Sequence, residues 1–189
     1  MLQKVKISNF GTIRGVSNFV DNGSKLHNID IENKIKNIDQ ISEFSKKIYE
    51  DKKVSFFEEK FLTGDVFLVN RKSLEDIGYF DNFFYGYFSD HDFGIRLRKA
   101  GYKLLVAKGA FAYHQRHSNF KYLDEISRKK KLNTRWARVF ENWARFKIKY
   151  SLPTNLMYTG INHIPWDKLS EKSKEKKFIN KTNYSKFLL

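Results

Sequence analysis

The chain of 189 residues is long enough for one domain with a hydrophobic core, since 41% of its residues are hydrophobic and 16% are aromatic. This composition excludes an intrinsically disordered chain. The absence of cysteine excludes disulfides, thiolate nucleophiles and cysteine-based zinc sites, and it suits a reducing compartment. The formal net charge of +15 suits a partner that carries phosphates, although general lysine-rich amino-acid usage gives the same excess.

Membrane-spanning and secretory signals are not found in the sequence. No apolar run approaches the roughly 20 residues that a membrane-spanning helix needs. The segment MLQKVKISNF lacks the apolar core of a signal peptide. We therefore expect a cytoplasmic protein.

The first part of the chain predicts strands followed by a helix. Residues 4–8 and 13–20 are strand-like and are bounded by turn residues. Apolar residues then recur at three- and four-residue steps, which predicts an amphipathic helix over residues 35–49. These are Ile35, Ile38, Ile41, Phe44 and Ile48.

The middle of the chain predicts alternating strands and helices. FLTGDVFLV, residues 61–69, is a candidate buried strand that Gly64 interrupts, and RKSLEDIGYFD predicts a short helix that closes at Gly78. FSDHDFGIRLRKAG predicts a second helix, and YKLLVAKGAFAYH predicts two short strands about a turn at Lys108-Gly109. This order indicates an α/β layer architecture.

The last part of the chain predicts a basic amphipathic helix followed by a tail. Between residues 132 and 150 the apolar residues fall on one helical face, and lysine and arginine occupy most of the other. We therefore divide the chain into residues 1–120, a helical extension at 121–150 and a Lys-rich tail at 151–189 that we expect to be partly disordered.

The stretch FSDHDFGIRLRKAG contains two aspartates with different expected roles. Ser89 and Asp92 have the spacing of a capping box at the start of a helix. Asp90 lies at the first helical position and is free to face a cleft, and we expect His91 to be a surface residue. The triplet Asp90-His91-Asp92 also reads as a metal-binding D-x-D motif, but such a motif ordinarily ends a strand, whereas this one opens a helix.

Residues 61–119 resemble the C-terminal half of family 2 glycosyltransferases with the GT-A fold. FLTGDVFLVNRKSLEDIGYFD is similar to the strand, short helix, Gly and aromatic-Asp pattern of that family. FFYGYFSDHDFGIRLRKAGYKLLVAKGAFAYH is similar to its aromatic loop, E-D-x-D helix, Gly-Tyr strand and terminal His. The later Asn142-Trp143 pair resembles its C-terminal extension. The resemblance implies a partial GT-A, Rossmann-like mixed sheet flanked by helices.

The resemblance also implies roles for individual residues. Asp90 matches the aspartate that takes the proton from the acceptor hydroxyl in inverting members, and Ser89 stands where the family usually has Glu. His114 matches a histidine that helps to hold Mn²⁺ or Mg²⁺ on the donor diphosphate. Gly64 and Asp65 match the strand that lines the acceptor pocket.

The donor half of the family, which ends in D-x-D, has no counterpart in residues 1–189. A split or truncated gene, a second chain that supplies the donor half, and a remnant retained for binding all remain open. We expect a glycosyltransferase that uses a nucleotide-sugar donor and a glycan acceptor, as in surface polysaccharide biosynthesis. The alternative is a non-catalytic scaffold, or a basic binding module whose helix around Trp136 and Trp143 docks nucleic acid, an anionic membrane or an acidic partner. Among the partners we expect peripheral membrane contact and do not expect nucleic acid.

Overall fold

The computed structural model describes residues 9–18, 37–53, 55–64, 66–114, 122–159 and 163–170. The strands in this part of the chain are β1 (Phe10–Ser17), β2 (Phe56–Glu59), β3 (Phe67–Val69) and β4 (Lys103–Ala112). The helices in it are α1 (Ile38–Lys52), α2 (Arg71–Ile77), α3 (Ser89–Lys99), α4 (Glu125–Lys149) and α5 (Trp166–Ser170). Within these residues, no helix combines the length and the apolar character needed to cross a bilayer.

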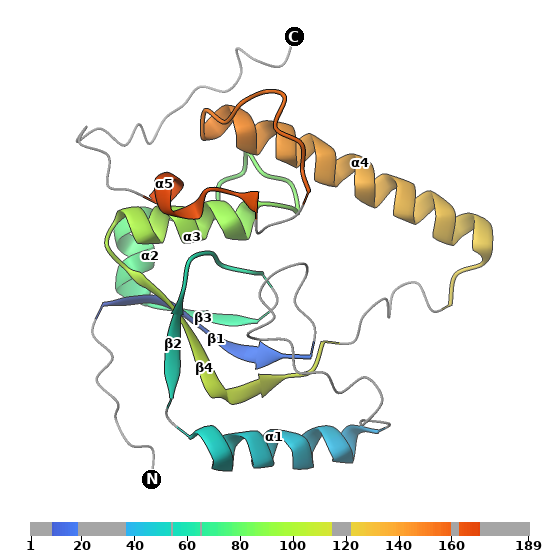
Figure 1. Ribbon diagram of the computed structural model, residues 1–189. Coiled ribbons are helices and arrows are strands. Elements are labelled where there is room, and N and C mark those ends of the chain that lie inside the picture. Colours follow the sequence, from blue (N-terminus) through green and yellow to red (C-terminus); the bar gives the residue numbers. More distant parts are fainter. Residues whose placement is uncertain are drawn as a thin grey trace.

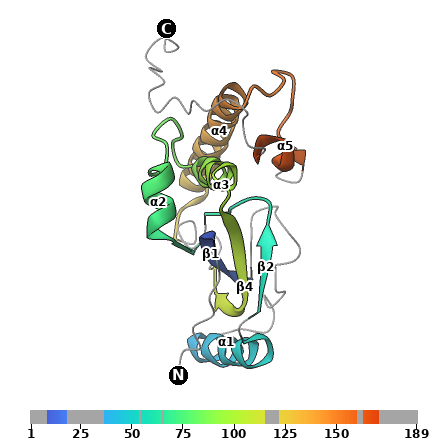
Figure 2. The same cartoon turned by 90° about the vertical axis from the view of Figure 1, so that its left-hand side faces the viewer.

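The strands form one mixed sheet in the order β2-β4-β1-β3. β1 and β4 are parallel, while β3 pairs antiparallel with β1 and β2 pairs antiparallel with β4. Helix α1 lies on one side of the sheet, and α2, α3, α4 and α5 gather on the opposite side (Figures 1 and 2). The prediction of an α/β architecture with a mixed sheet flanked by helices is confirmed.

The helices agree with the sequence better than the strands do. Helix α2 begins after Asn70, whose side chain caps it, and ends at Gly78, where φ is +79°. Two strand predictions need correction, and one strand was missed. β2 was not predicted at all, only Phe67–Val69 of the segment 61–69 is a strand, and residues 103–112 form one strand instead of two. The strand expected at residues 4–8 lies outside the described residues.

Gly109 does not make the turn that was predicted inside β4. A Cβ at this position would clash with the backbone oxygen of Lys53, and a Cβ at Gly15 would lie 2.6 Å from the backbone oxygen of Ala110. Both glycines therefore allow close approach of backbones and are not turn residues. The pairing of β1 with β4 also shifts register between Gly15 and Val16, which accommodates the irregularity without ending the strand.

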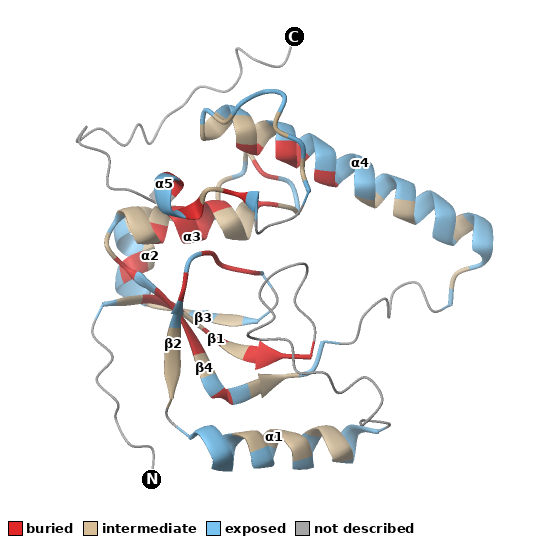
Figure 3. Ribbon diagram, in the orientation of Figure 1, coloured by how far each residue is buried: buried red, intermediate tan, exposed pale blue. Residues whose placement is uncertain are grey.

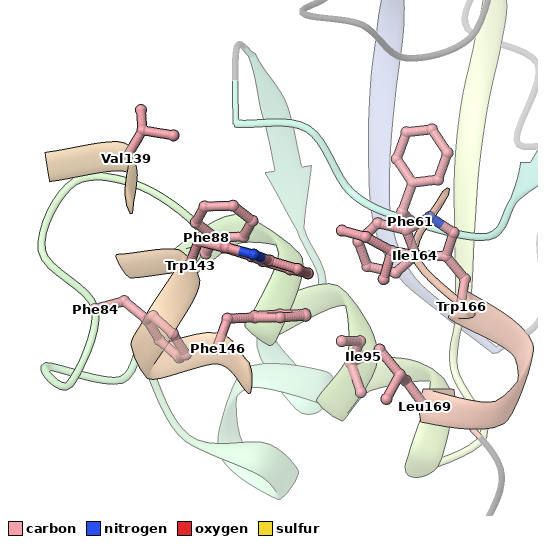
Figure 4. Packing of buried hydrophobic residues seen from close by; sticks show 10 residues of the cluster. All are labelled: Phe61, Phe84, Phe88, Ile95, Val139, Trp143, Phe146, Ile164, Trp166 and Leu169. Carbon is pink, nitrogen blue, oxygen red and sulfur yellow. The ribbon is translucent and has the colours of Figure 1, made fainter. Parts of the chain in front are cut away.

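The core consists of two clusters, one on each side of α3. Phe93 and Leu97 pack toward the sheet with Leu62, Tyr102 and Leu104. The other cluster joins α3 to the C-terminal helices, and the burial pattern of these elements is visible in Figure 3. Figure 4 shows its ten buried members, which are Phe61, Phe84, Phe88, Ile95, Val139, Trp143, Phe146, Ile164, Trp166 and Leu169.

The segments predicted as a helical extension and a tail contribute directly to this second cluster. Trp143 and Phe146 come from α4, Trp166 and Leu169 come from α5, and all four are buried. Helix α4 begins at Glu125, seven residues before the expected position 132, with Asp124 as its N-cap. The disorder expected for the end of the tail concerns residues 171–189, which lie outside the described residues.

Candidate functional site

The first turn of α3 differs from the predicted capping box. Phe88 is the N-cap residue, in the left-handed region at φ +66°, and no side chain caps the helix. The capping prediction for Ser89 and Asp92 is therefore wrong. Phe88 is buried against Trp143 and Phe146, with ring centroids at 5.6 and 5.3 Å. We infer that this packing outweighs the roughly 1–2 kcal/mol that a left-handed residue costs, so that the helix starts at Ser89.

Asp92 is the anionic centre of a buried group of charged and polar side chains, which we call the Asp92 cluster. Its side chain is 0% exposed. Its Oδ2 accepts a hydrogen bond from Arg96 Nε at 2.9 Å. Its Oδ1 accepts one from the Tyr150 hydroxyl at 2.7 Å and lies 2.5 Å from Lys149 Nζ. Lys149 also pairs with Asp81 at 2.6 Å. Every charge in this cluster has an opposite charge beside it.

The Asp92 cluster ties α3 to α4 and to the loop after α2. Arg96 donates further hydrogen bonds to the carbonyl oxygens of Ile77 and Tyr79. Burial, reinforced by the Asp92 carboxylate, raises the pKa of the Tyr150 hydroxyl well above its ordinary value. Burial alone would raise the pKa of Asp81. The hydrogen bond from Lys149, together with other favourable contacts, outweighs burial, so that the pKa of Asp81 is lowered.

The aromatic loop before α3 is held by a buried asparagine of α4. Asn142 accepts a hydrogen bond from the Tyr85 amide at 2.7 Å and donates one to the Tyr85 carbonyl at 3.0 Å. Arg145 also donates to the carbonyl oxygen of Phe83. These contacts fix the approach of the chain to Ser89 and so position the residues that follow it.

Asp90 lies in different surroundings from Asp92. Its side chain is 20% exposed, and its Oδ1 lies 3.7 Å from Nδ1 of His91. It packs against the backbone at Gly64, where an added Cβ would lie 3.0 Å from Asp90 Oδ2. The structure thus brings together two of the residues that were predicted for the site. The third, Asp65, lies outside the described residues.

His91 is not the surface residue that was expected. Its side chain is 12% exposed, and its Nδ1 lies 2.7 Å from the carbonyl oxygen of Leu62. Because a carbonyl only accepts hydrogen bonds, Nδ1 carries the proton in this contact. The ring packs edge-on against Phe61, Phe88 and Trp166. His91 therefore anchors the first turn of α3 to the aromatic cluster.

His114 lies just beyond the end of β4 and is exposed. Its backbone is held by Asn18, which accepts from the amide at 2.6 Å and donates to the carbonyl at 3.1 Å. Among the described residues, no group of three or more His, Asp or Glu side chains can hold a metal ion. Further ligands for Mn²⁺ or Mg²⁺ would have to come from outside these residues, so we assign no step to a metal.

Sequence reasoning missed the residues that complete the surroundings of the two aspartates. Lys149 and Tyr150 were expected only as parts of an amphipathic helix, and Trp166 only as part of the Lys-rich tail. The available signal was the apolar patch INHIPW at residues 161–166, which a disordered tail has no reason to contain. The partners themselves lie 57 or more positions away from Asp92 and could not be read from local spacing.

Comparisons with protein-family models, with curated proteins and with solved structures give no match. The resemblance to family 2 glycosyltransferases therefore stays a prediction from the ordered motifs of residues 61–119.

Proposed function

We propose that this chain carries the acceptor-side portion of an inverting glycosyltransferase, which moves a sugar from a nucleotide diphosphate donor to a glycan hydroxyl. Asp90 is the general base in this proposal. The observation that carries it is the difference between the two carboxylates of α3. Asp92 is fully paired within a buried cluster, while the Asp90 carboxylate is partly exposed beside Gly64.

The proposed reaction needs a base such as the carboxylate of Asp90. A carboxylate is ionised at neutral pH and can take the proton of the acceptor hydroxyl as that oxygen attacks the anomeric carbon. The bond from the anomeric carbon to the diphosphate breaks in the same step, and the nucleoside diphosphate leaves with the electron pair. Asp90 lies in the first turn of α3, where acidic side chains complement the partial positive charge of the helix end.

Rigidity around Asp90 also supports the proposal. A base must be held close to its productive geometry, since small displacements cost large factors in rate. The first turn of α3 is fixed by His91 on the Leu62 carbonyl and by Phe88 in the aromatic cluster. Gly64 allows close packing against Asp90 because it has no Cβ.

The donor half of the reaction is proposed to come from another polypeptide segment, because residues 1–189 show no counterpart of it. A divalent metal on the donor diphosphate would belong with that half, with His114 as one contributing ligand. The proposal includes a cytoplasmic location, which a chain without cysteine suits.

The test uses extracts of the source cells, which contain whatever supplies the donor half. The gene is deleted and replaced by the wild-type chain or by Asp90→Asn, and transfer of labelled sugar from a panel of nucleotide sugars to glycan is measured. We expect Asp90→Asn to lower the chain-dependent transfer about 10²- to 10⁴-fold, the usual contribution of a general base.

Asp51→Asn, the same change at an exposed position of α1, is the matched control and should restore full transfer. Full transfer by Asp90→Asn would rule out Asp90 as the base. If transfer from every nucleotide sugar in the panel survives deletion of the gene, the chain is not needed for transfer. A non-catalytic scaffold would then remain as its function.

A further inference from the structure

The N-terminal half of α4 is exposed although the C-terminal half is buried. All buried residues of this helix lie at Val139 or beyond, namely Val139, Asn142, Trp143 and Phe146. Figures 1 and 3 show the earlier part extending away from the sheet, with exposed or intermediate residues throughout. Apart from the buried Val139, residues 125–140 therefore present an open helical surface, which we call the α4 arm.

The α4 arm exposes large apolar side chains. Ile126 is 82% exposed, Trp136 is 52% exposed and Phe140 is 55% exposed. The rings of Trp136 and Phe140 stack on one another, with centroids 6.0 Å apart and planes 30° apart. With 3.6 residues per turn, these three and Leu132 lie within an arc of about 120° on one side of the helix.

Cations fill most of the remaining surface of the arm. On the same helical projection, Lys130 borders the apolar arc on one side and Arg128 and Arg135 border it on the other. The polar residues Glu125, Lys129 and Asn133 project within the arc, between its apolar members. Only one carboxylate, Glu125, lies within the same segment. The cationic residues are Arg128, Lys129, Lys130, Lys131, Arg135 and Arg138.

We infer that the α4 arm binds the surface of membranes that contain anionic phospholipid, lying parallel to the interface. An apolar arc with tryptophan at its centre and cations along both borders matches an interface where lipid phosphates surround an apolar layer. Long cationic side chains can bury their methylene stems and reach the phosphates. This inference does not depend on the proposed glycosyltransferase activity.

The arrangement favours a lipid surface over nucleic acid. A single-stranded nucleic acid would place its bases on aromatic rings and its phosphates on cations along one groove. In the α4 arm the Trp136 and Phe140 rings stack on each other, and most of the cations face away from them. A bilayer can contact the apolar arc and the cations at the same time, because an interfacial helix buries its apolar face among the acyl chains and keeps its cations at the phosphates.

The test measures co-sedimentation of the 189-residue chain with vesicles of phosphatidylcholine alone or mixed with phosphatidylglycerol. We expect binding to the mixed vesicles at about 0.15 M salt, weaker binding as salt rises, and little binding to pure phosphatidylcholine. Lys129→Glu, Lys130→Glu and Lys131→Glu together should weaken binding by at least about 100-fold. The same reversal of Lys46, Lys47 and Lys52, which are exposed on α1, is the matched control.

Tryptophan emission gives a second and independent readout. Trp143 and Trp166 are buried at 5% exposure, so a blue shift on addition of vesicles reports on Trp136. We expect the shift with mixed vesicles and its loss in Trp136→Phe, while Trp136→Ala with Phe140→Ala lowers binding. Three outcomes would overturn the inference. The first is no binding to mixed vesicles. The second is that the charge reversals on α1 and α4 weaken vesicle binding equally. The third is that a single-stranded oligonucleotide displaces the chain from vesicles while the aromatic substitutions leave binding unchanged.

Discussion

The two aspartates at the start of α3 are separated by one residue, yet they lie in opposite surroundings. Asp92 is completely buried among cations, and Asp90 is partly exposed beside a glycine. Residues two apart on a helix differ by about 200° around its axis, so they cannot share a face. Carboxylates that lie close in a sequence therefore need not form one site, and of these two it is Asp90 that the proposed function uses as the base.

The buried side of α3 is an electrostatic network whose stability depends on all of its members. Asp92 and Asp81 share Lys149, and Arg96 holds the other oxygen of Asp92. Burial lowers the pKa of the neighbouring Lys99, and the charge of Asp92 partly opposes that effect. Breaking such a network costs more than an exposed pair would, because the remaining charges stay buried.

Lys149→Met should produce the largest change on the buried side. It leaves the carboxylates of Asp81 and Asp92 close together without their shared cation, so we expect a loss of about 3–5 kcal/mol in the free energy of unfolding. Urea unfolding of the isolated chain measures this loss. Lys130→Met, at an exposed position of α4, should change the same quantity by less than about 0.5 kcal/mol. Equal effects would show that the Asp92 cluster is not stabilising.

Tyr150→Phe should have a smaller effect, because it removes one hydrogen bond to a charged group and leaves the ion pairs intact. We expect a loss of about 1.5–3 kcal/mol near neutral pH, measured by the same urea unfolding. Tyr79→Phe, on an exposed ring, is the control and should be almost neutral.

We also expect the free energy of unfolding of Tyr150→Phe to depend on alkaline pH differently from that of the wild type. Because the pKa of Tyr150 is raised in the fold, the unfolded chain loses this proton near its ordinary pKa of about 10 while the folded chain keeps it. The wild-type free energy of unfolding should therefore fall as pH rises above about 10. The fall should be shallower in Tyr150→Phe, and identical slopes would contradict the burial of an un-ionised Tyr150.

Gly64→Ala should have the smallest effect on stability, and it probes the exposed side of α3. The backbone of Gly64 is not in the left-handed region, and the nearest atoms belong to the movable side chain of Asp90. We expect a loss below about 1 kcal/mol in unfolding but about a 10- to 100-fold loss of transfer, because the base is displaced. In an Asp90→Asn background the extra loss of transfer should disappear.

The helices could be predicted from sequence because their signals are local. The repeats of apolar residues located α1 and α4, and the glycine at position 78 marked the end of α2. The predicted division into a domain and C-terminal segments did not indicate that these segments pack into the core. The apolar face of α4 indicates burial but does not say that its partners are Phe61, Phe88 and Ile95.

The strands and the helix cap could not be predicted because distant contacts decide them. β2 reads FFEE, which lacks the alternation of a half-buried strand, and it exists because β4 pairs with it. Ser89 and Asp92 satisfy the local rule for a cap, but the burial of Phe88 shifts the start of the helix. Tertiary packing outweighs local preference in both cases.

The site was predictable in part. The resemblance assigned Asp90 and Gly64 to one site, and the structure places them in contact. The assignment of Asp92 to a buried cluster required its partners Lys149 and Tyr150, which lie 57 and 58 positions away. A one-dimensional pattern cannot encode such a pairing.

The separation of the two carboxylates is tested most directly by urea unfolding of Asp90→Ala and Asp92→Ala side by side. We expect Asp92→Ala to lose about 3–5 kcal/mol or to fail to fold, because it leaves buried cations without their anion. Asp90→Ala should lose less than about 1 kcal/mol, the size of a helix-dipole contribution. Equal losses, or a larger loss for Asp90→Ala, would contradict the assignment of Asp92 to structure and of Asp90 to function.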